Sequence, residues 1–417
     1  MESQHLFGDE HAFDAPNLDL VFAKVKRVAI FAEAFLPKVD GVSKTAFLTL
    51  RYLQETGREV IVFAPDIAPS SVGGTPVIPL PSLGFNMAPE TRIALPHPLV
   101  VQHLTDFKPD LIHMFSPAVL SMSGMLVGRQ INVPIVANYQ TDLPAYAEHY
   151  GMPFLSGFVN NWLRTIHNGS HLTLVPSNYT LRELRGKGYH RLRRWGRGVN
   201  GERFNPKRGN AFMRARLLNG RDPDSLLCIY VGRLANEKRI DLLLDVARTP
   251  GVALTIIGDG ALRPELEALF AGTGTNFTGY MFGDDLAAAY ASADAFFFTG
   301  VSETFGQVVQ EALASGLPAV IINQGGITDL VEDGVNGFVC SDDPAEFAAA
   351  ARSLRDDLAL RTRMSEQARA IADRNPWMAI MAQLEGYYQE AYDLNERLNR
   401  VYPPRWNFLT WRMRRVN

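Results

Sequence analysis

The chain is 417 residues long, 47% hydrophobic and 20% charged, with a formal net charge of −3 at pH 7. This length exceeds what one ordinary hydrophobic core organises, so we expect two domains of roughly 200 residues each. The composition is that of a folded protein and argues against wholesale disorder. The slightly acidic balance disfavours general nucleic-acid binding through bulk electrostatics.

The two cysteines, Cys228 and Cys340, each lie in a strand-like apolar run and form no CxxC or Cys/His cluster. We therefore expect neither a disulfide framework nor a zinc site, which fits a reducing compartment. Residues 1–20 are acidic and lack an apolar run, so they do not resemble a signal peptide. The sequence predicts a cytoplasmic protein whose N-terminal segment, 1–25, is disordered.

One uncharged stretch, 111–128, is long enough to be tested as a membrane span. It contains His113, Pro117 and Gly124 together with three serines, and it divides naturally into a strand, a loop and a helix. We therefore predict that this stretch does not cross a membrane.

Short apolar runs rich in Val and Ile alternate with turn residues and helical stretches. In the first half these runs are RVAIFAE, REVIVFAP, DLIHMFS, PIVANYQ and HLTLVPS, and in the second they are LLCIYVG, VALTIIG, DAFFFTG and LPAVII. Continuous apolar runs suit strands buried on both faces, as in parallel sheets with helical crossovers. The predicted fold class is α/β, with two doubly wound Rossmann-like domains that bind ligands at the carboxyl ends of their strands.

A break between the two series falls near 200–210, at RGVNGERFNPKRGN, which is rich in Gly, Asn, Arg and Pro. We expect the hinge there, with one domain at 26–205 and the second at 206–377. The remaining segment, 378–417, begins as a long helix and ends in the basic, aromatic sequence PPRWNFLTWRMRRVN.

The stretch TGVSETFGQVVQEALASGLPAV, residues 299–320, carries only two charges, Glu303 and Glu311, among apolar and small residues. It predicts a strand end, a loop with Glu303, and a helix that carries Glu311 and ends at Gly316. A helix N-terminus at a strand end attracts an anion such as phosphate. Glu311 could accept hydrogen bonds from a ribose and Glu303 from a sugar ring. Alternatively, one acid is a capping or solvated group and the other is salt-bridged.

Two further loops follow strands. IYVGRLANEKRI places Arg233 and Lys238 after a strand, where Arg's planar fork and Lys's point charge suit a diphosphate; a solvated charged loop is the alternative. FAEAFLPKVDGVSKTAF places Gly41 before a helix that starts near Ser43, which allows a close backbone approach to a ligand. A tight turn alone would explain this glycine equally well.

Together these features resemble the retaining glycosyltransferases of glycosyltransferase family 4, which have the GT-B fold of two Rossmann-like domains facing each other across a cleft. The resemblance covers nearly the whole chain after about residue 26. The motifs that carry it are FLPKVDGVSKT, VPSNYT, RGVNGERFNP, VGRLANEKRI, SETFGQVVQEALASGLP and GGITDLVEDGVNGFV.

The resemblance implies that 26–205 binds the acceptor, that 206–377 binds the nucleotide sugar, and that the C-terminal helix crosses back to the first domain. It implies a catalytic set in which Arg233 and Lys238 hold the donor diphosphate and Glu303 contacts the transferred sugar. The expected substrate-binding residues are Gly41, Gln140, Asp142, Gly258, Phe305, Gly306, Gln307 and Glu311.

The sequence departs from the family pattern at two places. Asn200 stands where the family usually shows Asp, and Gln140 stands where many members have a histidine beside the donor sugar. The Gln form resembles a branch of GDP-mannose-dependent and lipid-glycosylating bacterial enzymes. Because Gln cannot carry a proton, Gln140 is expected only to hydrogen-bond a sugar hydroxyl. Asp142 could orient the acceptor, although a turn-capping role is the commoner one.

The expected reaction is transfer of a mannose- or glucose-type hexose from a GDP- or UDP-sugar to a lipid or glycolipid acceptor, as in EC class 2.4.1. Fixed Arg and Lys donors can stabilise the departing diphosphate without a metal, and the one DxD-like run, DPD at 222–224, precedes a strand and is predicted to be a turn. We therefore expect no cofactor and no metal site. A double displacement would need a carboxylate on the opposite face of the sugar, and only Asp142 could supply it. We therefore favour same-face retention, as the resemblance implies.

Two other classes remain open. A nicotinamide-dependent oxidoreductase could use IIGDGALRP after a strand, but GDG lacks the third glycine and no acid sits suitably at the next strand end; Gly258 to Gly260 suit a base pocket better. The other alternative is a non-catalytic sugar-nucleotide-binding protein that has kept the pocket. Turnover of labelled donor would distinguish it from a transferase.

Two basic segments bear on the acceptor. Residues 182–208 contain ten Lys or Arg against two Glu, and 405–417 contains four Arg, no acid, two Trp and one Phe. Basic residues with interfacial aromatics suit peripheral contact with the anionic inner face of a membrane. A solvated surface and a frayed tail are an equally good explanation.

Overall fold

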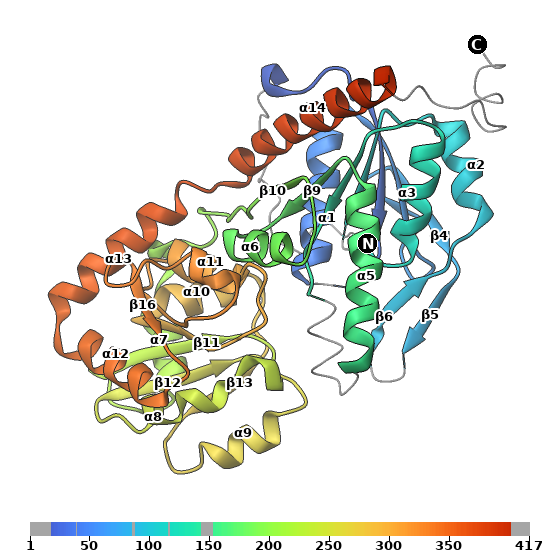
Figure 1. The fold of residues 1–417 in the computed structure, drawn as a ribbon. Helices are drawn as coiled ribbons and strands as arrows, with labels where there is room; N and C mark the ends of the chain where they lie inside the picture. The colour runs from blue at the N-terminus through green and yellow to red at the C-terminus, as the bar shows by residue number, and fades with distance from the viewer. Residues whose placement is uncertain (1–17, 39, 86–87, 116, 143–152, 402–417) are drawn as a thin grey trace. The chain divides into compact units, whose positions relative to one another are not determined.

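The structure is a computed structural model that describes residues 18–38, 40–85, 88–115, 117–142 and 153–401. The chain forms two compact units (Figure 1). The first comprises Met1–Pro176, Thr180–Gly196 and Ile380–Asn417, and the second comprises Ser177–Tyr179 and Arg197–Ala379. The division at 196/197 precedes the expected boundary at 205/206.

The first unit contains an eight-stranded sheet in the order β10-β9-β8-β7-β1-β2-β4-β3, parallel except where β3 pairs with β4. Its strands are β1 (Arg27–Ala32), β2 (Glu59–Pro65), β3 (Ser71–Val72), β4 (Thr75–Leu80), β7 (Leu111–Phe115), β8 (Ile135–Asn138), β9 (Leu172–Val175) and β10 (Leu192–Arg194). A separate hairpin is formed by β5 (Ser82–Phe85) and β6 (Ala88–Ala94).

The helices of the first unit are α1 (Gly41–Glu55), α2 (Pro98–Phe107), α3 (Leu120–Gln130), α5 (Pro153–Gly169), α6 (Asn178–Gly186) and α14 (Trp377–Val401). Helices α2, α3 and α5 pack together against an apolar core on one face of the sheet. From Ile380 onward α14 belongs to this unit, where a buried ion pair joins Glu385 to Arg58 at 2.7 Å. Tyr388 of α14 also contacts the buried His113 of β7, with 2.9 Å between its hydroxyl and Nδ1.

The second unit contains a fully parallel six-stranded sheet in the order β13-β12-β11-β14-β15-β16. Its strands are β11 (Leu226–Val231), β12 (Val252–Ile257), β13 (Asn276–Gly279), β14 (Ala295–Phe298), β15 (Ala319–Ile322) and β16 (Gly337–Cys340). Its α-helices are α7 (Ala211–Leu218), α8 (Leu244–Ala247), α9 (Arg263–Leu269), α10 (Gly283–Ser292), α11 (Gln307–Ala314), α12 (Pro344–Asp356) and α13 (Leu358–Ala372).

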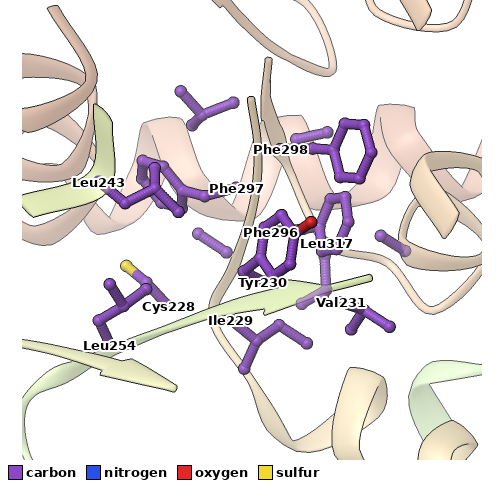
Figure 2. Packing of buried hydrophobic residues seen from close by; sticks show 14 of the residues in the cluster. Cys228, Ile229, Tyr230, Val231, Leu243, Leu254, Phe296, Phe297, Phe298 and Leu317 are labelled. Carbon is purple, nitrogen blue, oxygen red and sulfur yellow. The ribbon is translucent and has the colours of Figure 1, made fainter. Parts of the chain in front are cut away.

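Short 3-10 turns complete the two units, at η2 (Leu18–Leu20), η3 (Pro206–Arg208), η4 (Asn236–Lys238), η5 (Ile240–Leu243) and η6 (Gly326–Asp329). In the second unit, helices cover both faces of the sheet, with α8 and α12 in one group and α7, α10, α11 and α13 in the other. Between these layers lie the completely buried aromatic residues of β11 and β14, among them Tyr230, Phe296 and Phe298 (Figure 2).

These sheets confirm the predicted fold class, and all nine apolar runs named above form strands. Their continuous hydrophobicity follows from burial on both faces, as in β11 and β12, where all residues are buried. In the uncharged stretch 111–128, Leu111–Phe115 forms β7 and the residues from Leu120 onward belong to α3, which agrees with the predicted strand and helix. Within the described residues, no helix has the length and hydrophobicity needed to cross a bilayer.

The N-terminal segment differs from the expectation of disorder over 1–25. Residues 1–17 lie outside the described residues, but 18–25 are ordered: Leu18–Leu20 forms a 3-10 turn and Val25 is only 1% exposed. The backbone N–H of Phe22 donates to the Glu385 carboxylate of α14 at 2.9 Å. The order therefore comes from a long-range contact that local composition does not reveal. The tail 405–417 also lies outside the described residues.

Candidate active site

The candidate residues of the second unit gather where the strand order reverses. The chain moves from β11 outward to β12 and β13, then returns to β14 on the other side of β11. In such sheets the loops at the carboxyl ends of the two central strands diverge and leave a crevice for ligands. The loop after β11 carries Arg233 and Lys238, and the loop after β14 carries Glu303.

Arg233 is held by one contact from its own loop and one from β11. Its guanidinium forms a 2.6 Å ion pair with Glu237, whose side chain is 10% exposed, and its carbonyl accepts a 3.3 Å hydrogen bond from the buried Tyr230 hydroxyl. Burial raises the pKa of Tyr230 well above its usual value, and the nearby Glu303 and Glu237 raise it further. Glu237 thus fixes one terminal nitrogen of the Arg233 guanidinium, while the Arg233 side chain remains 44% exposed.

Lys238 and Glu303 form an ion pair between the two loops. Their side chains are 13% and 24% exposed, and the ammonium group also lies 5.6 Å from the ring centre of Phe298. The Lys238 carbonyl accepts a 2.7 Å hydrogen bond from the Thr299 hydroxyl at the end of β14. This pairing explains how Glu303 is tolerated among apolar neighbours, because charge in a partly buried site needs a partner.

The main chain around Glu303 is packed tightly against η6. The Gly326 N–H donates to the Glu303 carbonyl at 2.6 Å, and a Cβ on Gly326 would lie 2.0 Å from the Thr304 carbonyl oxygen. The same Thr304 carbonyl accepts a 2.8 Å hydrogen bond from Ser177. The Gly-Gly pair of the GGITD motif is therefore required by the close approach of these two loops.

Helix α11 starts at a glycine that no other residue could replace without strain. Gly306 is its N-cap, with φ +92° and no side-chain capping bond. A Cβ there would lie 2.3 Å from the Ile327 side chain. Phe305, immediately before it, is buried at 7% exposure. The left-handed turn at Gly306 starts α11 shortly after Glu303 in the chain, and the free N–H groups at a helix start can bind an anion.

Glu311 lies on α11 and is 7% exposed. The Tyr290 hydroxyl of α10 donates to its carboxylate at 3.5 Å. Burial raises the pKa of Tyr290 well above its usual value, and the Glu311 carboxylate adds to this shift. Tyr290 therefore remains a neutral hydrogen-bond donor and is a partner that the sequence did not reveal.

The hinge segment is tied to the same helix. The side-chain amides of Gln307 and Gln310 donate to the carbonyls of Gly198 at 3.1 Å and Arg197 at 2.8 Å. Asn200, at the position where the family usually shows Asp, accepts N–H bonds from residues 202 and 203 at 3.1 and 3.0 Å. The Gln307 amide nitrogen thus bonds the protein backbone, and the Asn200 side chain closes a turn.

The loop after β12 lies against the loop of Arg233. Gly258 has φ +143°, and a Cβ there would lie 1.9 Å from the Gly232 carbonyl oxygen. A Cβ at Gly260 would lie 2.3 Å from the Leu234 carbonyl oxygen. The GDG sequence is therefore explained by backbone packing beside the Arg233 loop.

Three predicted residues lie in the first unit. Gly41 is the first residue of α1, which begins two positions before the expected start near Ser43. The helix starts earlier because the Asp40 side chain caps it by accepting a hydrogen bond from the Ser43 backbone N–H. Among the described residues, no atom lies within 4 Å of a Cβ built at Gly41. Gln140 is buried at 8% exposure in the loop after β8. Asp142 accepts a 3.3 Å hydrogen bond from the Tyr139 hydroxyl.

The residues that sequence reasoning missed are mostly partners of the predicted ones. Glu237 could have been found from its spacing of four from Arg233, although η4 is a 3-10 turn and not an α-helix. Tyr290, Ser177 and Gln310 gave no local signal, because each acts across a long sequence separation. The predicted turn at 222–224 is confirmed by the bond from the Asp224 N–H to the Asp222 side chain at 3.0 Å. No group of three potential metal ligands occurs among the described residues.

Comparisons with known proteins agree with the topology. The family model described as "Glycosyltransferase Family 4" matches residues 39–203, and the one described as "Glycosyl transferases group 1" matches residues 216–371. The GDP-mannose-dependent alpha-mannosyltransferase of Mycobacterium tuberculosis is 38% identical over 373 residues, covering 87% of this chain and 96% of that protein. The alpha-monoglucosyldiacylglycerol synthase of Acholeplasma laidlawii is 27% identical over 346 residues, covering 75% and 84%. Anabaena Alr3699/HepE in complex with UDP has a TM-score of 0.69 and 19% identity, covering 88% of this chain and 100% of that one.

The two α/β units, each with a mainly parallel sheet, and these matches define an enzyme of the glycosyltransferase class with the GT-B fold. Within that class, the chain belongs to glycosyltransferase family 4, as the motifs predicted. The nicotinamide-dependent oxidoreductase is left without support.

Proposed function

We propose that this enzyme transfers a hexose, mannose in the first instance, from a GDP-sugar to a hydroxyl group of a lipid or glycolipid acceptor, with retention of configuration. The observation that carries the proposal is the convergence of Arg233, Lys238 and Glu303 at the ends of the adjacent strands β11 and β14. The relative from M. tuberculosis named as GDP-mannose-dependent supports the donor. The relative named as a glucosyldiacylglycerol synthase supports a lipid acceptor.

The proposed chemistry is departure of the nucleoside diphosphate from an oxocarbenium-like sugar. Arg233 and Lys238 stabilise the negative charge that develops on the leaving diphosphate, and their partners Glu237 and Glu303 hold them in place before the donor arrives. Such pre-positioned charges stabilise a transition state without reorganisation during the reaction. On this mechanism the enzyme requires no metal.

Glu303 has two tasks in this proposal. It orients the Lys238 ammonium, and its carboxylate lies at the loop where the transferred sugar binds, so it also stabilises positive charge that develops at the sugar ring. Glu311, on the helix that follows, binds the ribose of the nucleotide. Gln140 and Asp142 remain candidate contacts to sugar hydroxyls in the first unit, and Gly41 a candidate for close backbone approach to the phosphates.

The direct test is turnover. Purified enzyme is incubated with GDP-[14C]mannose, and in parallel with UDP-[14C]glucose, in detergent micelles of diacylglycerol, monoglucosyldiacylglycerol or phosphatidylinositol. The expected result is radioactive lipid with an α-linked hexose, its configuration read by NMR. Tight binding of GDP-mannose with no transfer and no hydrolysis would favour the sugar-nucleotide-binding alternative. A β-linked product would contradict retention.

We also propose peripheral contact with an anionic membrane. Of the ten cations of 182–208, those from 197 onward belong to the second unit, and Arg197 among them is buried at 7% exposure. The first unit keeps a set on α6, β10 and the adjoining loops, of which Arg182, Arg185, Lys187, Arg191 and Arg194 are exposed. Exposed Lys and Arg near a membrane surface are each attracted by about 1 kcal/mol to anionic lipid.

Sedimentation with vesicles tests this contact. Binding to vesicles containing 30% phosphatidylglycerol should exceed binding to pure phosphatidylcholine and should fall at high salt. Deletion of 405–417 should reduce binding while leaving GDP binding intact if the tail takes part. Equal binding to both vesicle types would show that these cations form an ordinary solvated surface.

A further inference from the structure

Tyr290 of α10 carries a hydroxyl group that needs a partner inside the core of the second unit. The residue is completely buried, and a buried hydroxyl without a hydrogen bond would destabilise the fold. This hydroxyl donates to Oε2 of Glu311 at 3.5 Å, across 21 residues of sequence. Burial and the Glu311 carboxylate both raise the pKa of Tyr290 well above its usual value. Tyr290 is therefore a permanent donor to the carboxylate that we assign to the ribose.

The ring of Tyr290 is held in place by two other aromatic rings. Phe204, which is buried, packs edge-on against it, with centroids 5.7 Å apart and an interplanar angle of 81°. Phe296 of β14, one of the buried aromatic residues in Figure 2, lies with its ring centre 5.8 Å from that of Tyr290. Edge-to-face pairs of this kind stabilise a protein beyond the burial of their area. The direction of the Tyr290 hydroxyl is thus set by the packing of its ring.

Phe204 belongs to the hinge segment, and Arg369 of α13 fixes that segment to α11. The guanidinium group donates to the carbonyls of Gly201 at 3.2 Å, Phe204 at 2.8 Å and Ala314 at 2.5 Å. Asp373 forms an ion pair with the same group at 2.7 Å. Ala314 is the last residue of α11, where the carbonyls at a helix end attract a cation. One side chain thus joins the backbone of Phe204 to the end of α11.

These contacts form one connected path from the hinge segment to Glu311. We infer that Tyr290, held by Phe204 of the hinge segment, is a positioning residue that orients the Glu311 carboxylate toward the ribose hydroxyls of the donor. The inference rests on the proposed function, in which Glu311 binds the ribose. Because Tyr290 engages Oε2, the plane of the carboxylate is fixed before the nucleotide arrives. A side chain that is already ordered loses less conformational freedom on binding, so the ribose diol is bound more tightly.

Isothermal titration of GDP and of 2′,3′-dideoxy-GDP into the full-length protein tests the inference, because the two ligands differ only in the ribose hydroxyls. Tyr290→Phe removes the phenolic hydroxyl and keeps the ring. It should weaken GDP about 3- to 10-fold, the range of one hydrogen bond, and should change dideoxy-GDP less than about twofold. The double variant with Glu311→Gln should bind GDP within about twofold of Glu311→Gln alone, because Tyr290 acts through Glu311. A residue that only stabilised the fold would not distinguish the two ligands.

Two further variants test the hinge segment and the specificity of the effect. Arg369→Lys supplies a point charge in place of a planar fork, so it cannot bond three carbonyls at once. It should weaken GDP about threefold and leave dideoxy-GDP within about twofold. Thr255→Val is the matched control, because it also removes a buried hydroxyl of this unit, one that donates to the Leu217 carbonyl at 2.7 Å. It should lower the melting temperature and change neither affinity.

The outcomes separate this inference from the proposed function. Unchanged GDP affinity in Tyr290→Phe, or equal weakening of both ligands, would overturn the positioning role, as would additive effects in the double variant. Equal weakening of both ligands in Arg369→Lys would overturn the part assigned to the hinge segment. Wild-type protein that binds GDP and dideoxy-GDP equally would instead contradict the ribose role of Glu311, and failure to bind either nucleotide would contradict the proposed donor.

Discussion

Glu303→Gln tests the ion pair that joins the two central loops of the second unit. Removing one partner of a fully buried pair costs about 3–5 kcal/mol, whereas an exposed pair contributes about 0–1 kcal/mol. Lys238 and Glu303 are 13% and 24% exposed, and the glutamine can still accept a hydrogen bond from the ammonium group. We therefore expect a loss of about 1–2 kcal/mol in stability, small enough for the variant to remain folded.

The effect on catalysis should be larger than the effect on stability. Loss of one pre-positioned electrostatic contact to a transition state lowers kcat by about 100- to 1000-fold. We expect kcat of Glu303→Gln to fall by about 100-fold, with the donor KM within about threefold of wild type. Affinity for GDP alone should change little, because the glutamine can still accept a hydrogen bond from the Lys238 ammonium and keep it in place.

The assay is steady-state transfer from GDP-mannose, with GDP affinity measured separately by calorimetry. Glu366→Gln is the matched control, since Glu366 is an exposed acid on α13, and it should behave as wild type. A normal kcat in Glu303→Gln would show that this acid does not act in the transition state. A drop in GDP affinity as large as the drop in kcat would show that it serves only to hold Lys238.

Three further predictions follow from neighbouring contacts. Glu311→Gln should raise the donor KM about tenfold with kcat within twofold, because a ribose is bound alike in ground and transition states; a selective loss of kcat would refute the ribose role. Activity should persist in excess EDTA, and its complete loss with recovery on adding Mg²⁺ would refute metal independence. Glu385→Gln should lower the unfolding free energy by about 3–5 kcal/mol because the ion pair to Arg58 is buried. Glu390→Gln on the same helix should cost under about 1 kcal/mol, because the side chains of Arg193 and Glu390 in its ion pair are 43% and 35% exposed; equal melting temperatures of the two variants would contradict the argument.

Much of the fold was predictable because the strands carry their own signal. Runs such as LLCIYVG and VALTIIG are apolar throughout, since β11 and β12 are covered on both faces. The short strands β13 and β10 escaped prediction, because NFTG and LRR are partly polar edge strands with no sustained apolar run. The long-range pairing of α14 with the first unit depends on Arg58 and Glu385, which are 327 residues apart in sequence, and only a family resemblance suggested it.

The residues of the candidate site could be proposed from the sequence, but the contacts between them could not. The positions of Arg233, Lys238 and Glu303 after strands indicate which edge of the sheet they share. The sequence does not show that Lys238 contacts Glu303 across two loops, because the adjacency of β11 and β14 is a property of the sheet order. Glu311 raised the same difficulty: its partner Tyr290 lies on α10, and no spacing rule connects them.

Calorimetric titration of GDP into the wild type and into Arg233→Ala and Lys238→Ala is the most direct test of the proposed donor site at the ends of β11 and β14. Each variant should lose about 1.5–3 kcal/mol of binding free energy, the range for a charged hydrogen bond, which corresponds to about 10- to 150-fold in Kd. Unchanged GDP affinity in both folded variants would contradict the assignment of these two cations to the diphosphate.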